Sequence, residues 1–381
     1  MGMMARFKTS AAPTFLSAVL LSIVSAGCSR AVEPSDAPAA DEKIVFFPSL
    51  ASVVPGGQLW SVSVQGRIFR PAGVSKERTL LIEAIAKAFD LDDNDAKSAL
   101  FDQRASYFLS ISEPNRRVSV KIGAHTLALP PSDSGGYFEG EIQLPSDEAA
   151  KLANAGVMSY ESVPTAVNAS RFSGTARLAP EEGLSVVTDM DDTIKVTNVL
   201  NRTEMLKNTL VRPFTAVAGM PALYRSWQEA GGEHILFHVV SAGPWQFNEP
   251  LRQFTKDFAF PDFSWHMRSG LKPTNPEEVM QELKPNPEPF KISTIEVLMR
   301  RFPKRHFVCV GDSGERDPEV YSRLLRDFPN QVDAVFIHNV THKSEDVERF
   351  KNLFPGQTAV KLRVFDDPTE LPPLAAFTAV R

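Results

Sequence analysis

The chain has 381 residues, of which 43% are hydrophobic and 23% charged, and its formal net charge at pH 7 is −5. This length exceeds what one compact core usually supports, so we expect two domains behind an N-terminal leader. The composition is that of an ordinary globular protein, and the net charge gives no sign of a nucleic-acid binder. A polybasic membrane patch is not evident either.

Residues 1–27 have the features of an export signal. Basic residues Arg6 and Lys8 precede an apolar stretch, Phe15 to Val24, that is too short to span a bilayer. Ser25-Ala26-Gly27-Cys28 then resembles a bacterial lipobox, although Ser25 departs from the usual Leu. We therefore predict a lipoprotein signal peptide over 1–27 and a lipidated Cys28 as membrane anchor. Plain secretion with a buried structural cysteine is the alternative.

The residues after Cys28 predict a tether and a destination. Residues 28–42 are rich in Ala, Pro, Asp and Glu, a composition typical of disorder. Ser29 stands where Asp would retain a lipoprotein at the inner membrane, so in a Gram-negative cell we expect the outer membrane, facing the periplasm. A secreted or soluble periplasmic protein is the alternative. Once Cys28 is acylated only Cys309 remains, which predicts no internal disulfide and a core position for Cys309.

Residues 43–178 predict a β-rich domain with a helical insertion. Trp60, Val62 and Val64 alternate with polar residues, as a half-buried strand requires. Residues 76–89 interrupt the strands with apolar residues at helical spacing. Further strands are expected at Tyr107 to Ile111, Val118 to Ile122, Tyr137 to Leu144 and Phe172 to Leu178.

Residues 180–381 change to an alternation of strands and helices, which predicts an α/β domain with a parallel sheet covered on both faces. A helix is expected from Pro221 to Gly231, because Pro favours helix starts and Gly helix ends. The expected strands are Leu184 to Thr188, Ile235 to Val240, His306 to Val310 and Ala334 to Ile337.

The most informative motif follows the first of these strands. Asp189 and Asp191 are two residues apart, so in an extended segment both carboxylates point to one side, where a cation can bridge them. An EF-hand is excluded because Ile194 and Leu200 stand where it needs Gly and Glu. A helix cap is the other interpretation of the isolated motif.

Polar residues also end the next strands. Ser241 follows the second strand, Lys291 opens a helix, and Asp312 and Asp317 follow the third strand in a GDxxxxD pattern. Ligands bind at the carboxyl ends of such strands, so these groups are expected to meet. The seven His residues show no zinc-ligand spacing such as HExxH.

The order of nucleophile, hydroxyl, cation and carboxylate cluster resembles the haloacid dehalogenase superfamily of phosphoryl-transfer enzymes, which have a Rossmann-like parallel sheet. The amino-acid sequence around these motifs resembles that of the Mg²⁺-dependent phosphatidate phosphatases of the actin-patch type. The stretches that carry this resemblance are Asp191 to Thr197, Gly219-Met220-Pro221, Pro244-Trp245-Gln246 and Gly311 to Tyr321.

Two positions depart from the bacterial relatives. Ser241-Ala242-Gly243-Pro244-Trp245 stands where they tend to carry Ser-x-Ser-Pro-Trp, so a second hydroxyl is missing. His338-Asn339 stands where Arg-Asp is usual. These departures concern substrate selectivity more than the chemical step.

The resemblance implies a role for each site residue. Asp189 would be the nucleophile that forms an aspartyl-phosphate, and Asp191 the acid and then the base. Ser241 and Lys291 would bind phosphoryl oxygens. Mg²⁺ would be held by Asp189, Asp312 and the backbone carbonyl of Asp191, with Asp317 orienting the metal shell. The role of Glu315 stays open, and Thr193 would fix the loop.

The sequence is compatible with three functions. The first is an exported, Mg²⁺-dependent phosphatase acting on a lipid phosphate, for instance phosphatidate to diacylglycerol. The second is a phosphatase for soluble periplasmic phosphomonoesters, since little room for a large cap separates the motifs. The third is a non-catalytic lipoprotein that binds a partner on a phosphatase-like scaffold. The sequence identifies no protein partner.

Overall fold

The computed structural model describes residues 35–73, 75–270, 273–356 and 361–377. The predicted signal peptide and Cys28 lie outside the described residues. Within the predicted tether, residues 35–42 are described and differ from the expectation of disorder, because they pack on the first sheet. Ala37 is 2% exposed, and the buried carboxylate of Glu42 is paired with Arg70 and Arg116. Among the described residues, no helix is both long and apolar enough to cross a bilayer.

The first half of the chain forms a ten-stranded mixed sheet with the order β1-β3-β2-β10-β9-β5-β6, in which β4, β7 and β8 pair off this path. Its pairs are antiparallel, apart from the parallel pair β2 and β10. The strands are β1 Lys43–Phe47, β2 Ser49–Val53, β3 Leu59–Arg70, β4 Ile111–Ser112, β5 Ser119–Ile122, β6 His125–Ala128, β7 Tyr137–Pro145, β8 Ala153–Asn154, β9 Val157–Ser162 and β10 Ser173–Ala179, with helix α4 at Ser146–Leu152.

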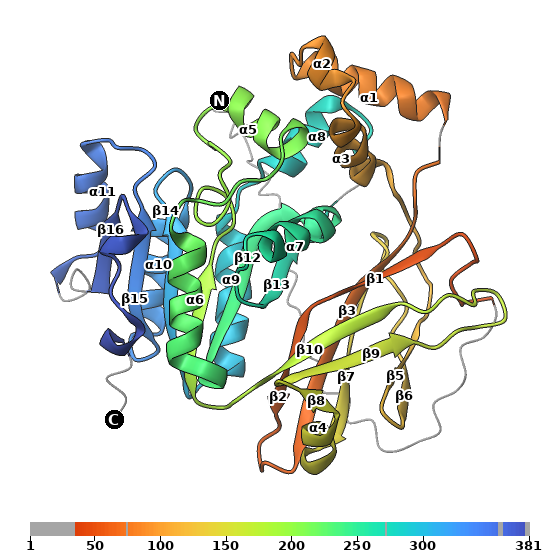
Figure 1. The fold of residues 1–381 in the computed structure, drawn as a ribbon, viewed down its shortest axis with the longest axis horizontal. Coiled ribbons are helices and arrows are strands. Elements are labelled where there is room, and N and C mark those ends of the chain that lie inside the picture. Colours follow the sequence, from red (N-terminus) through yellow and green to blue (C-terminus); the bar gives the residue numbers. More distant parts are fainter. Residues whose placement is uncertain (1–34, 74, 271–272, 357–360, 378–381) are drawn as a thin grey trace, which may run out of the picture.

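The helical insertion is larger than predicted. It contains α1 (Lys76–Ala88), α2 (Asp93–Ala96) and α3 (Ala99–Leu109), which lie beside α5 and α8 in Figure 1. The strand predicted over residues 107–111 is wrong, since α3 continues to Leu109 and only Ile111 and Ser112 pair as β4. Ser98 caps the start of α3. Phe108 and Leu109, which the sequence pattern assigned to a strand, lie on the buried face of this helix.

The second half forms a six-stranded, all-parallel sheet with the order β13-β12-β11-β14-β15-β16, which confirms the predicted α/β class. Numbered along the domain this is 3-2-1-4-5-6, the doubly wound order whose switch point lies between β11 and β14. The strands are β11 Gly183–Thr188, β12 Ile235–Pro244, β13 Phe263–Arg268, β14 Arg305–Asp312, β15 Val332–His338 and β16 Leu362–Phe365.

Helices cover both faces of this sheet (Figure 1). α6 and α7 pack on one face with Val186 and Val239, and α9, α10 and α11 pack on the other with Val187 and Cys309. The predicted core position of Cys309 is thus confirmed, at 0% exposure. The helices are α5 Arg202–Leu206, the π-helix η1 Lys207–Val211, α6 Met220–Gly231, α7 Asn248–Asp257, α8 Pro276–Leu283, α9 Glu288–Arg301, α10 Asp317–Asp327 and α11 Glu345–Leu353.

The two halves share an apolar core. Phe47 of β1 stacks on Trp245, which follows β12, with ring centroids 3.8 Å apart. The Tyr137 hydroxyl of β7 donates to Gln246 Oε1 at 3.1 Å. At the far end of α9, Arg301 donates to the hydroxyls of Ser52 and Ser63 on the first sheet. The first half therefore holds the loop after β12 and one end of α9.

Candidate active site

The carboxyl end of β11 places Asp189 at the switch point. The strand ends at Thr188, and the Asp189 amide still donates to the Val310 carbonyl of β14 at 2.9 Å. Asp189 is only 2% exposed, so its carboxylate sits in a space shielded from solvent. Beyond Thr188 the chain turns, with Asp192 at a φ of 52°. The expected extended geometry therefore does not continue to Asp191.

Asp312 ends the neighbouring strand β14, and Asp317 begins α10. One carboxylate oxygen each of Asp189, Asp312 and Asp317 lies within 4.8 Å of the others, and all three residues are buried. Asp317 Oδ2 accepts from the Asp312 amide at 3.2 Å. Gly311 permits this approach, since a Cβ there would lie 2.4 Å from Asp317 Oδ2. The GDxxxxD pattern thus brings two carboxylates together.

The open oxygens of this cluster fit a metal ion. Among the described residues, Asp189 Oδ2 and Asp312 Oδ2 are buried without a hydrogen-bond partner. Unpaired buried carboxylate oxygens are costly, and hard cations such as Mg²⁺ bind oxygen ligands. Both oxygens of Asp317 are already engaged, one by Lys291 and one by the Asp312 amide. Asp317 is thus placed to orient the cluster, while Asp189 and Asp312 keep an oxygen free.

Lys291, in the first turn of α9, supplies the cation of the cluster. Its ammonium lies 2.8 Å from Asp189 Oδ1, 2.5 Å from Asp317 Oδ1 and 3.7 Å from Glu315 Oε2, and its side chain is 1% exposed. Lys291 therefore lies at the start of a helix, as predicted, and its ammonium lies beside Asp189, the predicted nucleophile. Four carboxylates with one lysine leave an excess of negative charge that a divalent cation would neutralise.

The charges shift the pKa values of these groups. Burial raises the pKa of Asp189 and of Asp312 well above the usual range, and neighbouring carboxylates raise them further. Burial likewise raises the pKa of Glu315 to about 7. Burial alone would lower the pKa of Lys291, but Asp189, Asp317 and Glu315 outweigh it and raise it. Lys291 therefore stays charged.

Asp191 is held apart from this cluster. Its Oδ1 is 2.7 Å from the ammonium of Lys195 and accepts from the Thr197 hydroxyl at 2.5 Å. Burial would raise the pKa of Asp191, but Lys195 and Thr197 outweigh it and lower it. The sequence interpretation missed both partners. The signal was a lysine four residues after Asp191 in a run that is otherwise apolar or hydroxylic.

Asp192 fixes the loop in which Asp191 lies. Its carboxylate accepts backbone hydrogen bonds from Thr197, Asn198 and Val199, each at 2.7 Å. His338 Nδ1 lies 2.6 Å from the Asp192 carbonyl, and its ring stacks on Phe365. The unusual His338 of β15 thus contacts the backbone of the acidic loop, whereas the Asn339 side chain contacts Asp366.

Ser241 lies near the end of β12 at the same edge of the sheet. Thr188 of β11 pairs with Val239, so Ser241 stands two residues beyond the level of Thr188. Its hydroxyl accepts from the Gly243 amide at 3.1 Å, and the residue is 2% exposed. A register shift between Ser241 and Pro244 marks a bulge at this point. The role of Ser241 in phosphoryl binding stays a prediction.

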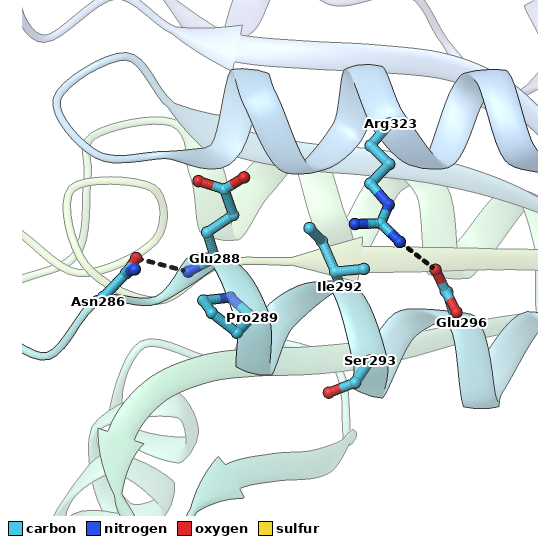
Figure 2. A pocket seen from close by; sticks show the side chains of 7 residues that line it. All are labelled: Asn286, Glu288, Pro289, Ile292, Ser293, Glu296 and Arg323. Atoms are coloured by element: carbon cyan, nitrogen blue, oxygen red, sulfur yellow. Dashed lines mark hydrogen bonds and ion pairs between the residues drawn. The ribbon is translucent and has the colours of Figure 1, made fainter. Parts of the chain in front are cut away.

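A surface hollow lies close to the start of α9 but does not include the predicted site. Figure 2 shows it between α9 and α10, with Glu288, Ile292 and Arg323 among its lining residues. Its volume is about 530 Å³. Lys291 and the carboxylates of the cluster are not part of its lining.

Comparison with known proteins bears on the same segment. Residues 184–339 match the family described as "Phosphatidate phosphatase APP1, catalytic domain". Phosphatidate phosphatase APP1 of Saccharomyces cerevisiae is 29% identical over 179 residues, 43% of this chain and 27% of that protein. An uncharacterized protein of Schizosaccharomyces pombe is 26% identical over 161 residues, 42% of this chain and 25% of its own length. The chain thus spans about a quarter of the length of these curated relatives.

Likeness to solved structures adds nothing to the assignment. A beta-glucuronidase of Parabacteroides merdae aligns with 78% of this chain and 35% of its own at 9% identity, with a TM-score of 0.27. A score this low supports no statement about shared fold or chemistry.

Proposed function

Because residues 184–339 match the catalytic domain of a phosphatidate phosphatase family, we propose that this protein is a Mg²⁺-dependent phosphatase acting through an aspartyl-phosphate. The observation that carries the proposal is the buried cluster of Asp189, Lys291, Asp312 and Asp317 at the switch point of the parallel sheet. Carboxylates at such an edge are suited to phosphoryl transfer, in which charge must be neutralised and a nucleophile positioned.

Each residue has a task in this reaction. Asp189 attacks phosphorus, and the bond from phosphorus to the leaving oxygen breaks while Asp191 donates a proton to that oxygen. Asp191, now ionised, takes a proton from the water that attacks the aspartyl-phosphate, which releases inorganic phosphate and restores Asp189. Lys291 and Ser241 bind phosphoryl oxygens and stabilise their charge in the transition state.

The metal would be held by the free oxygens of Asp189 and Asp312 and by the backbone carbonyl of Asp191, with Asp317 orienting the cluster. When bound, it spreads the negative charge of the phosphoryl group. Asp317 keeps Asp312 in place through the amide contact already described. Oxygen ligands without a thiolate or imidazole among them favour Mg²⁺ over Zn²⁺.

We place the substrate among lipid phosphates, for instance phosphatidate. The name of the matching family supports this choice, and so would the anchor that the sequence predicts at Cys28, which would keep the site beside a membrane. A phosphatase for soluble phosphomonoesters is the second candidate, and a non-catalytic binding module is the third. The intact Asp189, Asp191, Lys291 and Asp312 count against the third.

The deciding experiment is a phosphate-release assay on purified protein that lacks residues 1–27. The substrates are phosphatidate and lysophosphatidate in detergent micelles, a sugar phosphate and a nucleotide, each with Mg²⁺ and with excess EDTA. We expect Mg²⁺-dependent release from the lipid phosphates. Preference for the soluble esters would favour the second candidate, and release from none of them the third. Full activity in excess EDTA would contradict the metal assignment.

A further inference from the structure

Lys195 is a second buried lysine at the site, and neither the reaction scheme nor the predicted site residues use it. Its side chain is 3% exposed, although burying an ammonium is costly unless it is paired. The pairing is with Asp191 Oδ1 at 2.7 Å and with the Thr197 hydroxyl. The two acidic groups of the motif are thus matched to two different lysines, Asp189 to Lys291 and Asp191 to Lys195.

The contacts on Asp191 are one-sided. The Lys195 ammonium and the Thr197 hydroxyl both reach Oδ1, while the Asp191 side chain keeps 31% of its surface exposed. A carboxylate held at one oxygen by two donors cannot rotate freely, so its other oxygen is fixed in direction. A fixed direction serves proton exchange, because the carboxyl group must lie within hydrogen-bond reach of the oxygen that it protonates or deprotonates.

Backbone hydrogen bonds also hold Lys195 in place. The Lys195 amide donates to the Met190 carbonyl at 2.9 Å, and the Lys195 carbonyl accepts from the Asp192 amide at 2.7 Å. Lys195 also forms β-bridges with Asp191 and Ala216. The loop therefore folds back on itself, so that Lys195 lies beside Asp191, four residues earlier in the chain.

Support also comes from the helical insertion of the first half. The Lys195 ammonium lies 5.2 Å from the centre of the Phe214 ring, and the Arg104 guanidinium of α3 lies 3.7 Å from the same centre. Arg104 also donates to the carbonyls of Thr209 and Arg212, at the end of the π-helix η1. Cations over aromatic faces are stabilised by the ring. The Phe214 ring is thus fixed from the insertion and packs beside Lys195.

We propose that Lys195, with Thr197, is the positioning residue that directs the carboxylate of Asp191 toward the leaving oxygen. The proposal rests on the proposed function, since it assigns Lys195 a part in the same reaction. It concerns the proton-transfer group alone and leaves the attack by Asp189 untouched. Substitution of a residue that only supported the loop would slow both the proton transfer by Asp191 and the attack by Asp189.

The test separates these roles by leaving group. The kcat and KM of wild type and Lys195→Met are measured with Mg²⁺ on dioleoyl phosphatidate in mixed micelles and on 4-nitrophenyl phosphate. Loss of an orienting partner typically costs about 10- to 100-fold. We expect this loss in kcat for phosphatidate, whose alkoxide needs a proton, and a loss of less than about threefold in phosphorylation by the aryl ester, whose leaving group needs little protonation. The phosphorylation step is followed as the burst of 4-nitrophenolate, because later hydrolysis also uses Asp191.

A double-mutant cycle gives the second readout. If Lys195 acts through Asp191, Lys195→Met should add almost nothing to the loss already caused by Asp191→Asn. Additive losses, or equal losses on both esters, would overturn the proposal. Thr197→Val, which removes the other donor to Oδ1 and keeps the charge, should show the same selectivity and serves if Lys195→Met fails to fold. The exposed pair partner Lys304 gives the control, since Lys304→Met should leave both rates unchanged.

The outcomes also separate this inference from the proposed function. An active wild type whose Lys195→Met and Thr197→Val variants lose both rates equally rejects the positioning role alone. A folded wild type that hydrolyses with Mg²⁺ neither these two esters nor any substrate of the phosphate-release assay rejects the phosphatase assignment and the positioning role with it.

Discussion

Asp189 and Asp191 are close neighbours in the chain and contact different lysines, so substitution should separate their tasks. Asp189→Asn should remove the nucleophile and leave no phosphoenzyme. Asp191→Asn should keep the nucleophile and lose proton transfer, so turnover should fall by about 10²- to 10⁴-fold. With an aryl phosphate the phosphoenzyme should then accumulate, because no base prepares the hydrolytic water.

Rapid quench and mass spectrometry of the Asp189 peptide would detect that intermediate. Wild-type activity in Asp189→Asn, or a phosphoryl group found on Ser241 or on a histidine, would contradict the scheme.

Lys291 should matter for stability as well as for catalysis. Removing one partner of a buried ion pair typically costs about 3 to 5 kcal/mol, because the remaining charges lose their compensation. Lys291→Met should therefore lower the free energy of unfolding by this amount in EDTA, measured by urea denaturation. Saturating Mg²⁺ should reduce the difference from wild type, since the cation replaces the lost charge. A variant as stable as wild type in EDTA would mean that the carboxylates are not charged together.

At the residue scale the sequence predicted identities better than contacts. Motif order predicts Asp189, Lys291, Asp312 and Asp317, and they meet because β11 and β14 end, and α9 and α10 begin, at one edge of the sheet. The pairing of Asp191 with Lys195 was not predicted, because it depends on a tight loop with a left-handed Asp192. An extended strand, the simplest assumption for alternating acids, has no such turn.

At the scale of elements, β12 and β13 carry two histidines, the buried His238 and the half-buried His266, that should make stability depend on pH. His238 lies between the hydroxyls of Ser185 and Ser264, and His266 contacts Ser264. Burial lowers the pKa of His238 well below its usual value and that of His266 to about 4. In the unfolded chain a histidine titrates near pH 6.5. As pH falls from about 6.5 to 4 the unfolded state binds more protons, so the free energy of unfolding falls.

Asp189, Asp312 and Glu315, whose pKa values burial raises, contribute with the opposite sign, so the comparison must be between variants. The free energy of unfolding of wild type minus that of His266→Asn should decrease as pH falls from about 6.5 to 4. Urea denaturation at several pH values measures it. A difference that is constant with pH would mean that His266 takes up its proton in the folded state.

The elements themselves were predictable where a pattern was long. Four strands of the parallel sheet and the helix at Pro221 were found because apolar runs and helix boundary residues marked them. The strands β13 and β16 were missed. These strands, Phe263–Arg268 and Leu362–Phe365, lie at the two edges of the sheet, where one-sided pairing requires less apolar character. The false strand over 107–111 shows the reverse error, since aromatic residues suit a buried helix face as well.

At the scale of the whole molecule, the location of the protein depends on residues outside the described range. If Cys28 is acylated, wild type should sediment with membranes and Cys28→Ser should not, because acyl chains supply the hydrophobic anchor and a polar tether cannot. Fractionation with immunoblotting, and mass spectrometry of the N-terminal peptide, measure this. Soluble wild-type protein with an unmodified Cys28 would contradict the anchor.

The stacking of Phe47 on Trp245 joins the two halves at a point just beyond Ser241. A fragment starting at residue 180 would contain the family-matched segment, yet it would expose the aromatic residues that Phe47 and Tyr137 now cover. Freshly exposed apolar surface of this kind favours aggregation over solubility. Expression trials and crystallisation should therefore use a chain that keeps Phe47 and Tyr137, and should not start at the border of the matched segment.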